Sequence, residues 1–163
     1  MSKREFGLWG ALLVSVTCGV AFAQTPPPAP APAAGPTPAE RAIEYRQAVY
    51  KIVAGNFGPL AQVAQGKAEF KADVARRQAT RLAQIATFVG DSYPDISKEG
   101  KTRALPAIWA NRAEFDQLVA DFGAHTRKLA EVVEKGEAGA DFQAAVTAVG
   151  GDCKTCHEKF RAK

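Results

Sequence analysis

A five-residue motif near the C-terminus restricts this chain more than any other feature: Cys153-Lys154-Thr155-Cys156-His157. The spacing Cys-x-x-Cys-His is the attachment signature of a c-type haem, in which two thiols form thioethers and the imidazole ligates the iron. On a helix these three side chains share one face, because residues three and four apart are neighbours. We therefore predict one covalent haem c, attached by Cys153 and Cys156, with His157 as the axial iron ligand.

Two other kinds of site use cysteine and histidine at short spacing. A structural zinc site needs four ligands, but the chain has no second cysteine pair, and His125 is its only other histidine. A thioredoxin-type cysteine pair lies beside a strand–helix unit, and no segment of this sequence reads as a strand. Haem attachment therefore explains the motif better than either alternative.

The N-terminal residues 1–23 have the pattern of an export signal. Lys3 and Arg4 precede an apolar stretch over 6–20, and Ala21-Phe22-Ala23 is a small-x-small cleavage site. The alternative is a membrane anchor, but the apolar stretch is shorter than the roughly 20 residues that a bilayer span requires. We expect cleavage after Ala23 and a periplasmic protein.

Cleavage would leave 140 of the 163 residues and a formal charge of +3, because Lys3, Arg4 and Glu5 contribute +1 of the total +4. Such a mild charge gives no argument for binding nucleic acid or a membrane.

Residues 24–38 contain seven prolines among alanines and glycine, which predicts an extended, disordered linker. The remainder, 39–163, is long enough for one domain with a hydrophobic core.

Apolar residues recur at helical spacing in four segments of that remainder, over about 38–66, 70–89, 111–136 and 140–161. This pattern predicts an all-α fold, an antiparallel four-helix bundle. Thr37, Pro38 and Glu40 predict a capping box at the start. We expect Pro59 to kink or interrupt the first helix and Gly150-Gly151 to interrupt the last. The connection over 91–107 is long enough to be functional.

The number of methionines and histidines in the sequence limits which side chain could be the sixth ligand of the iron. Met1 is the only methionine and would leave with the signal, so the mature chain would have no methionine ligand. His125 lies at a core-facing register and is the remaining imidazole, which keeps bis-histidine ligation open, although a packed core histidine is commoner. We favour five-coordinate iron with an open side that binds small gases.

The chain resembles the cytochromes c′, the high-spin class II c-type cytochromes, over 39–163. The resemblance rests on four short segments: 44–47 (Glu-Tyr-Arg-Gln), 56–58 (Asn-Phe-Gly), 106–109 (Pro-Ala-Ile-Trp) and 150–157 with the haem motif. It implies a periplasmic homodimer whose five-coordinate haem iron binds nitric oxide and carbon monoxide.

The same resemblance implies roles for individual residues, each with a plainer alternative. Arg46 would reach a haem propionate, or would be a solvated helix arginine. Tyr50 would lie above the iron, or would be a core aromatic, and it shares a helix face with Arg46, Val53 and Phe57. Arg161 would lie beside the proximal face, or would be an exposed arginine favoured by the helix dipole. Gln47 and Thr102 would lie near the haem edge.

These observations favour a gas-binding protein that handles nitric oxide. The alternative is a periplasmic electron-transfer cytochrome with a redox partner, which we rank second because five-coordinate iron reorganises more on electron transfer. An enzyme is not expected, because a peroxidase needs a distal acid–base histidine and the first helix offers none.

Overall fold

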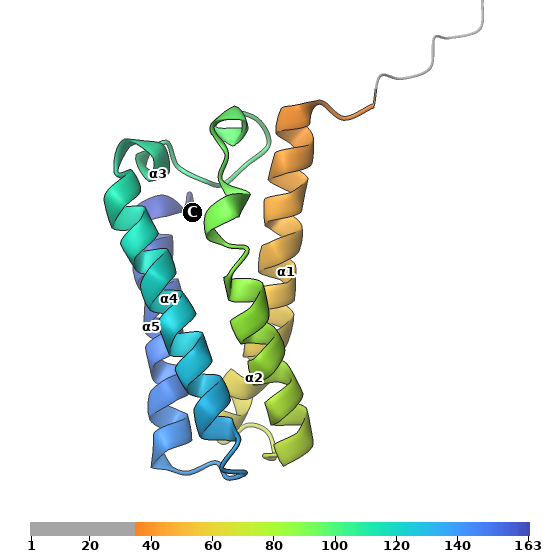
Figure 1. Ribbon diagram of the computed structural model, residues 1–163, viewed down its shortest axis with the longest axis vertical. Helices are drawn as coiled ribbons and strands as arrows, with labels where there is room; N and C mark the ends of the chain where they lie inside the picture. Colours follow the sequence, from red (N-terminus) through yellow and green to blue (C-terminus); the bar gives the residue numbers. More distant parts are fainter. Residues whose placement is uncertain (1–34) are drawn as a thin grey trace, which may run out of the picture. The chain divides into compact units, whose positions relative to one another are not determined.

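The computed structural model describes residues 35–163, so the predicted signal over 1–23 and most of the predicted linker over 24–38 lie outside the described residues. Four long helices run along the molecule (Figure 1), and the segment between the second and third of them carries a short helix and two single-turn 3₁₀ helices. The long helices are α1 (Pro38–Ala64), α2 (Ala72–Ala86), α4 (Arg112–Val133) and α5 (Ala140–Phe160). The short elements are η1 (Gly90–Ser92), η2 (Asp95–Ser97) and α3 (Ala107–Ala110).

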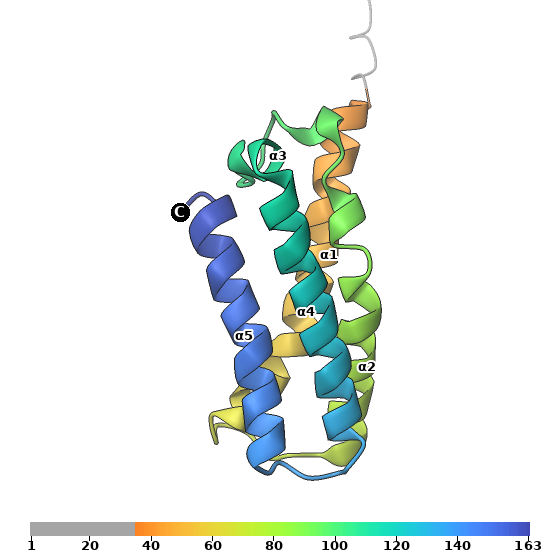
Figure 2. The same ribbon diagram turned by 60° about the vertical axis from the view of Figure 1, so that its left-hand side comes forward.

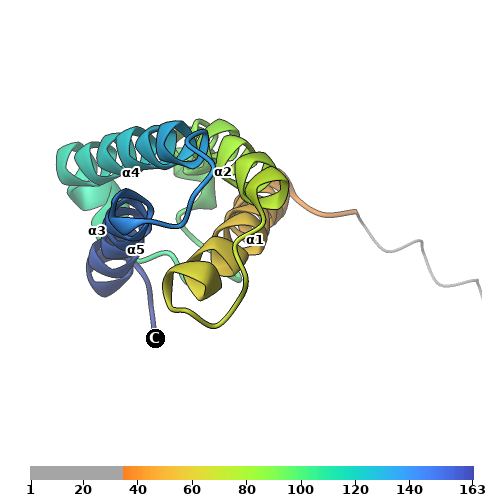
Figure 3. The same ribbon diagram turned by 90° about the horizontal axis from the view of Figure 1, so that it is seen from below.

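The long helices form a ring in which each helix packs on two neighbours, as the view along the bundle shows (Figure 3). The order around the ring is α1, α2, α4 and α5, and α1 packs least closely on α5. Figure 2 shows α3 and the connection covering one end of the bundle, near the end of α5. The predicted all-α four-helix bundle is confirmed. Within residues 35–163, no helix has the length and apolar character needed to cross a membrane.

The predicted capping box begins α1. Thr37 Oγ1 accepts from the Glu40 backbone N–H at 3.2 Å, and Glu40 Oε2 accepts from the Thr37 N–H at 2.8 Å. Pro38 occupies the first turn, where its missing N–H costs nothing. Two of the four N–H groups that any helix start leaves unpaired are thereby satisfied.

The interruption expected at Gly150-Gly151 does not occur, since α5 is continuous there. Of the two outcomes expected at Pro59, a kink or an interruption, the continuous α1 excludes the interruption. The reason is tertiary packing, which outweighs a local propensity cost of about 1 kcal/mol per glycine. Leu60 follows Pro59 and is 1% exposed, and Val149 precedes the glycines and is fully buried. Each helix is thus held by core contacts at the weak position.

The core has two parts. The larger fills the bundle with residues from all four long helices and includes the fully buried Ala79, Leu82, Leu129 and Val133. The smaller lies at the end covered by the connection and contains Tyr93, Ile108, Phe115 and Phe160. The connection over 91–107 therefore contributes a buried aromatic side chain to the core, which explains why so long a segment is ordered.

The C-terminal segment is fastened to the connection by backbone pairing. The N–H of Leu105 donates to the carbonyl of Phe160 at 2.9 Å, and the N–H of Ala162 donates to that of Arg103 at 2.8 Å. The Arg103 guanidinium adds two bonds to the Ala162 carbonyl, at 2.7 and 3.0 Å. The end of the helix with the haem motif is thus tied to the segment that contains Thr102.

Candidate haem site

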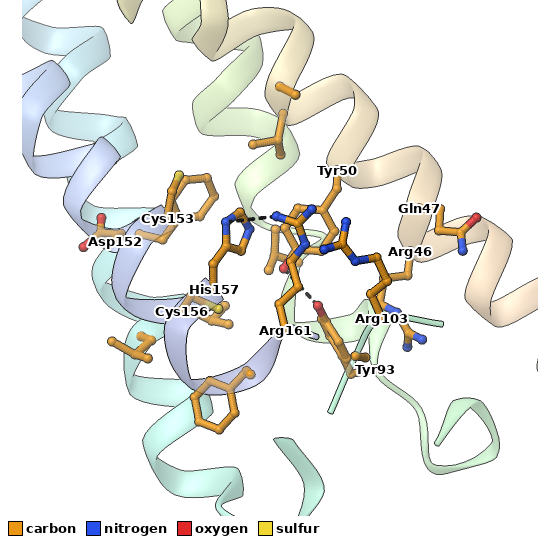
Figure 4. Close-up of a pocket in the computed structure, with 18 of the residues that line it drawn as sticks. Arg46, Gln47, Tyr50, Tyr93, Arg103, Asp152, Cys153, Cys156, His157 and Arg161 are labelled. Atoms are coloured by element: carbon orange, nitrogen blue, oxygen red, sulfur yellow. Dashed lines mark hydrogen bonds between the residues drawn. The ribbon is translucent and has the colours of Figure 1, made fainter. Parts of the chain in front are cut away.

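The three motif side chains line one cavity of about 710 Å³ between α5 and α1. Figure 4 shows Cys153, Cys156 and His157 projecting from α5 towards Tyr50 on α1. Both thiols are free, and burial raises their pKa values, that of Cys153 to about 11. The helix thus presents two neutral thiols and an imidazole on one face, as the spacing predicts.

The wall opposite the motif comes from α1 and is mostly apolar. Tyr50, Val53 and Phe57 line it, so the three residues expected on the open side of the iron lie together. Burial, more than any neighbour, raises the pKa of Tyr50 far above its ordinary value, so its side chain is a neutral phenol. A Cβ built on Gly150 would lie 3.7 Å from the ring of Phe57, which is the close approach that this glycine permits.

Arg46 lies at the edge of the cavity and is 3% exposed. Its guanidinium donates to Ser97 Oγ and Thr102 Oγ1, both at 2.8 Å, and more weakly to the carbonyls of Ser92 and Ser97. These partners are uncharged, and burial lowers the arginine pKa. A buried cation held by neutral oxygens suits a nearby anion. The propionate contact predicted for Arg46 stays a prediction.

The two weaker candidates for the haem edge also line the cavity. Thr102 accepts the bond from Arg46, and Gln47 donates from Nε2 to the carbonyl of Lys101 at 3.2 Å. Both therefore hold the connection against α1. The structure brings them to the cavity with Arg46, although their contact with a haem stays a prediction.

Arg161 lies one turn after His157, and its Nη1 is 3.4 Å from the imidazole Nδ1 (Figure 4). The pKa of His157 is lowered, first by burial and then by the charges of Arg161 and Arg103. A lowered pKa favours the neutral imidazole, which is the form that ligates a metal ion.

The other histidine lies away from the cavity lining. His125 Nδ1 is 2.8 Å from Asp152 Oδ2, and its side chain is 44% exposed. The prediction of a core-facing register was wrong, because its neighbours Phe122 and Thr126 take the buried positions. The arrangement gives no support to bis-histidine ligation.

Sequence reasoning missed one functional residue. Tyr93, in the connection, lines the cavity and donates from its hydroxyl to the Tyr50 hydroxyl at 3.1 Å. The available signal was the length of the connection, but no periodicity shows which side chain of an irregular segment turns inward. Trp109 packs on Tyr93, with 6.1 Å between ring centroids.

These residues fit a covalently attached haem. Two free thiols on successive turns and an imidazole on the same face open onto a cavity with apolar walls, and a buried cation lies at its edge. This combination of fold and site defines a c-type cytochrome built on a four-helix bundle.

The comparisons with known proteins identify the family. The family model described as cytochrome c′ matches residues 41–161. The cytochrome c′ of Rubrivivax gelatinosus is 37% identical over 123 residues, which cover 75% of this chain and 95% of the relative. Its crystal structure superposes with a TM-score of 0.70 at 36% identity, covering 74% of this chain and 94% of that one. The chain belongs to the cytochrome c′ family and carries one covalently attached haem c.

Two further solved structures are similar. One is the nitric oxide complex of a mutant cytochrome c prime from Alcaligenes xylosoxidans, with 28% identity, a TM-score of 0.70, and coverage of 77% of this chain and 97% of that one. The other is a cytochrome c′ described as having ligand-controlled dimer dissociation, with 32% identity, a TM-score of 0.72, and coverage of 80% and 100%.

Proposed function

We propose that this protein binds small diatomic gases, nitric oxide above all, at a five-coordinate haem iron in the periplasm. When bound, the haem supplies an iron that takes a gas on the side opposite its axial imidazole. The observation that carries the proposal is the wall facing His157, where Tyr50, Val53 and Phe57 present an apolar surface with one neutral phenol. The nitric oxide complex of the Alcaligenes relative supports it.

In this proposal, each residue of the site has a distinct role. Cys153 and Cys156 hold the haem, and His157 ligates the iron in its neutral form. Tyr50, Val53 and Phe57 exclude water and limit the size of what enters. Arg46, supported by Thr102, fixes the edge that carries the propionates, and Arg161 lies beside the axial imidazole. No step of this function breaks or makes a bond in a substrate, so the proposal is a binding protein and not an enzyme.

The proposed location rests on the sequence. The pattern of residues 1–23 is that of an exported protein, and export is required where haem is attached to paired cysteines outside the cytoplasm. Mass spectrometry of the protein purified from a periplasmic fraction tests this directly. A mature N-terminus at Gln24 is expected, whereas an intact Met1 on cytoplasmic protein contradicts it.

A homodimer is part of the proposal, and the outer face of α1 is the surface that suits it. Tyr45 and Ile52 are 46% and 48% exposed and lie two turns apart on one face. Exposed apolar side chains in a row mark an interaction site more often than isolated ones do. Ile52→Glu should give a monomer in analytical ultracentrifugation, whereas the matched control Phe88→Glu, at a 47% exposed site on another segment, should not.

Electron transfer remains the second candidate, and one observation favours it. Lys51, Arg103 and Arg161 are exposed and line the mouth of the cavity, so an acidic redox partner could approach the haem edge there. Such a partner would reduce or oxidise the iron without entering the cavity.

One experiment separates the two candidates. Absorption spectra are recorded for the oxidised and reduced holoprotein, alone and with nitric oxide or carbon monoxide. High-spin bands in both oxidation states, and a large spectral change on adding either gas, are expected for the gas-binding function. A sharp low-spin α band in the reduced protein without added ligand, unchanged by carbon monoxide, would show six-coordinate iron and support electron transfer.

A further inference from the structure

The two tyrosines that line the cavity form a hydrogen-bonded pair. The hydroxyl of Tyr93 donates to the hydroxyl of Tyr50 at 3.1 Å, and the rings meet edge to face with centroids 6.5 Å apart (Figure 4). A phenol has one proton to donate and an oxygen that accepts. The pair therefore has two phenolic protons and one hydrogen bond between its oxygens, and when Tyr93 is the donor the proton of Tyr50 is not used in the pair. That proton remains available to a ligand in the cavity that Tyr50 lines.

Tyr93 is held far more firmly than Tyr50. Its side chain is 8% exposed, and its ring packs edge to face on Phe115 at 4.7 Å and on Trp109 at 6.1 Å. The Arg46 guanidinium lies 4.7 Å from the centroid of the same ring, a cation–π distance. A ring fixed by three neighbours leaves its hydroxyl in one place, and that hydroxyl is the point to which Tyr50 is tied.

The backbone of Tyr93 is fixed as well. Trp109 Nε1 and Arg112 Nη1 donate to its carbonyl at 3.3 and 3.4 Å. Tyr50 packs partly buried against both core clusters, and its hydroxyl makes one hydrogen bond within residues 35–163, the one with Tyr93. The hydrogen bond from Tyr93 is therefore the polar contact that decides where the Tyr50 hydroxyl lies.

We propose that Tyr93 is a positioning residue that holds Tyr50 across the cavity and leaves the Tyr50 hydroxyl free to donate a hydrogen bond to a small bound ligand. The inference rests on the proposed gas-binding function and specifies it, because it selects ligands whose outer atom accepts a hydrogen bond. Donation by Tyr93 also polarises the Tyr50 O–H, since hydrogen bonds in a chain strengthen one another in a buried site. The pair thus restricts entry and favours polar diatomic ligands once they have entered.

The test uses carbon monoxide as the probe on the reduced holoprotein, with two readouts. The infrared stretching frequency of bound carbon monoxide reports a hydrogen bond to its oxygen, and flash photolysis gives the association rate. The variants are Tyr93→Phe and Tyr50→Phe, each of which removes one hydroxyl. Thr147→Val is the control, because it removes a hydroxyl from an exposed residue of α5 that does not line the cavity.

We expect Tyr50→Phe to raise the stretching frequency, because the donor to the ligand is lost. Tyr93→Phe should move the band in the same direction and broaden it, and should speed association on the order of two- to tenfold, the equivalent of one net hydrogen bond. Adding Tyr93→Phe to Tyr50→Phe should change the frequency no further. Thr147→Val should match the native protein.

The positioning role is overturned if Tyr93→Phe leaves both the band and the association rate at native values while Tyr50→Phe shifts the band. The donor role is overturned if Tyr50→Phe leaves the band unmoved. Native protein that binds no carbon monoxide contradicts the gas-binding function itself, which is a separate outcome. Trp109→Phe gives a second route should Tyr93→Phe fail to fold: it loosens Tyr93 without touching the cavity, and should give a smaller shift in the same direction.

Discussion

Arg46 on α1 and Thr102 in the connection are joined by a hydrogen bond of 2.8 Å across 56 positions of sequence. Thr102 lies next to Arg103, which is bonded to Ala162 beyond the end of α5. One continuous set of bonds therefore runs from the first helix, through the connection, to the helix that carries the haem motif. Both walls of the cavity are positioned by this set of contacts at the same end of the bundle.

Arg46→Ala should lower the free energy of unfolding by about 2–4 kcal/mol, because it removes buried, charge-assisted hydrogen bonds to Ser97 and Thr102. Arg46→Lys should not restore stability, since a single ammonium cannot reach both partners as a planar guanidinium does. Urea unfolding of the holoprotein measures the loss. Arg41→Ala, at an exposed site on α1, is the control. Native-like stability of Arg46→Ala would contradict the structural role.

Tyr50→Ala should speed the association of carbon monoxide and nitric oxide with the reduced protein, because it opens the wall that faces His157. Truncating a side chain that blocks entry acts on the association rate first and on affinity second. Stopped-flow mixing measures the rates, with Phe88→Ala as the control, since Phe88 is 47% exposed and does not line the cavity. Equal rates for native protein and Tyr50→Ala would remove Tyr50 from the open side of the iron.

Gly151→Ala should stabilise the protein by about 0.5–1 kcal/mol, because glycine in a helix interior is unfavourable relative to alanine. A Cβ at this position meets no atom within 4 Å, and the residue is exposed. Thermal unfolding of the holoprotein measures the gain. Gly150→Val is the contrasting change, since its extra methyl groups would press on Phe57 and the cavity. A destabilising Gly151→Ala would show that the haem needs this glycine as well.

The α1 capping box makes stability depend on pH. Hydrogen bonds from the backbone and side chain of Thr37 lower the pKa of Glu40 from its ordinary value of 4.5. A lowered carboxyl pKa stabilises the fold above 4.5, and that contribution disappears as the pH falls through the folded value. The difference in stability between native protein and Glu40→Gln should therefore be present at neutral pH and should shrink in acid. Urea unfolding at pH 7 and pH 3 tests this, and a difference independent of pH would contradict it.

Thr37→Ala probes the other half of the same box. It should cost about 1 kcal/mol, the usual value for losing a helix N-cap. Thr147→Ala is the control, because its hydroxyl bonds to a carbonyl within α5 and caps nothing. Equal losses in the two variants, measured by urea unfolding, would mean that the α1 cap has no special role.

Local patterns were sufficient where a single element decides the outcome. The spacing of Cys153, Cys156 and His157 predicted a shared face on one helix, and Thr37 with Glu40 predicted the start of α1. The same reasoning failed at Gly150 and Gly151, where contacts with other helices keep α5 intact despite unfavourable local propensity. Local preference is worth about 1 kcal/mol at such positions, and burial of neighbouring side chains exceeds it.

By itself, the sequence determined the haem motif, the four helices and the shared face of Arg46, Tyr50 and Phe57, because helical periodicity places residues three and four apart on one side. That this face meets the motif was implied by the resemblance to the cytochromes c′. Only the tertiary structure decided that Tyr93 reaches Tyr50, that Arg46 is buried against Ser97 and Thr102, and that His125 pairs with Asp152. These contacts join residues 27 to 56 positions apart through an irregular connection or between helices. Helical periodicity does not predict the direction of side chains in an irregular segment or their contacts with another helix. Their partners are therefore known only from the folded structure.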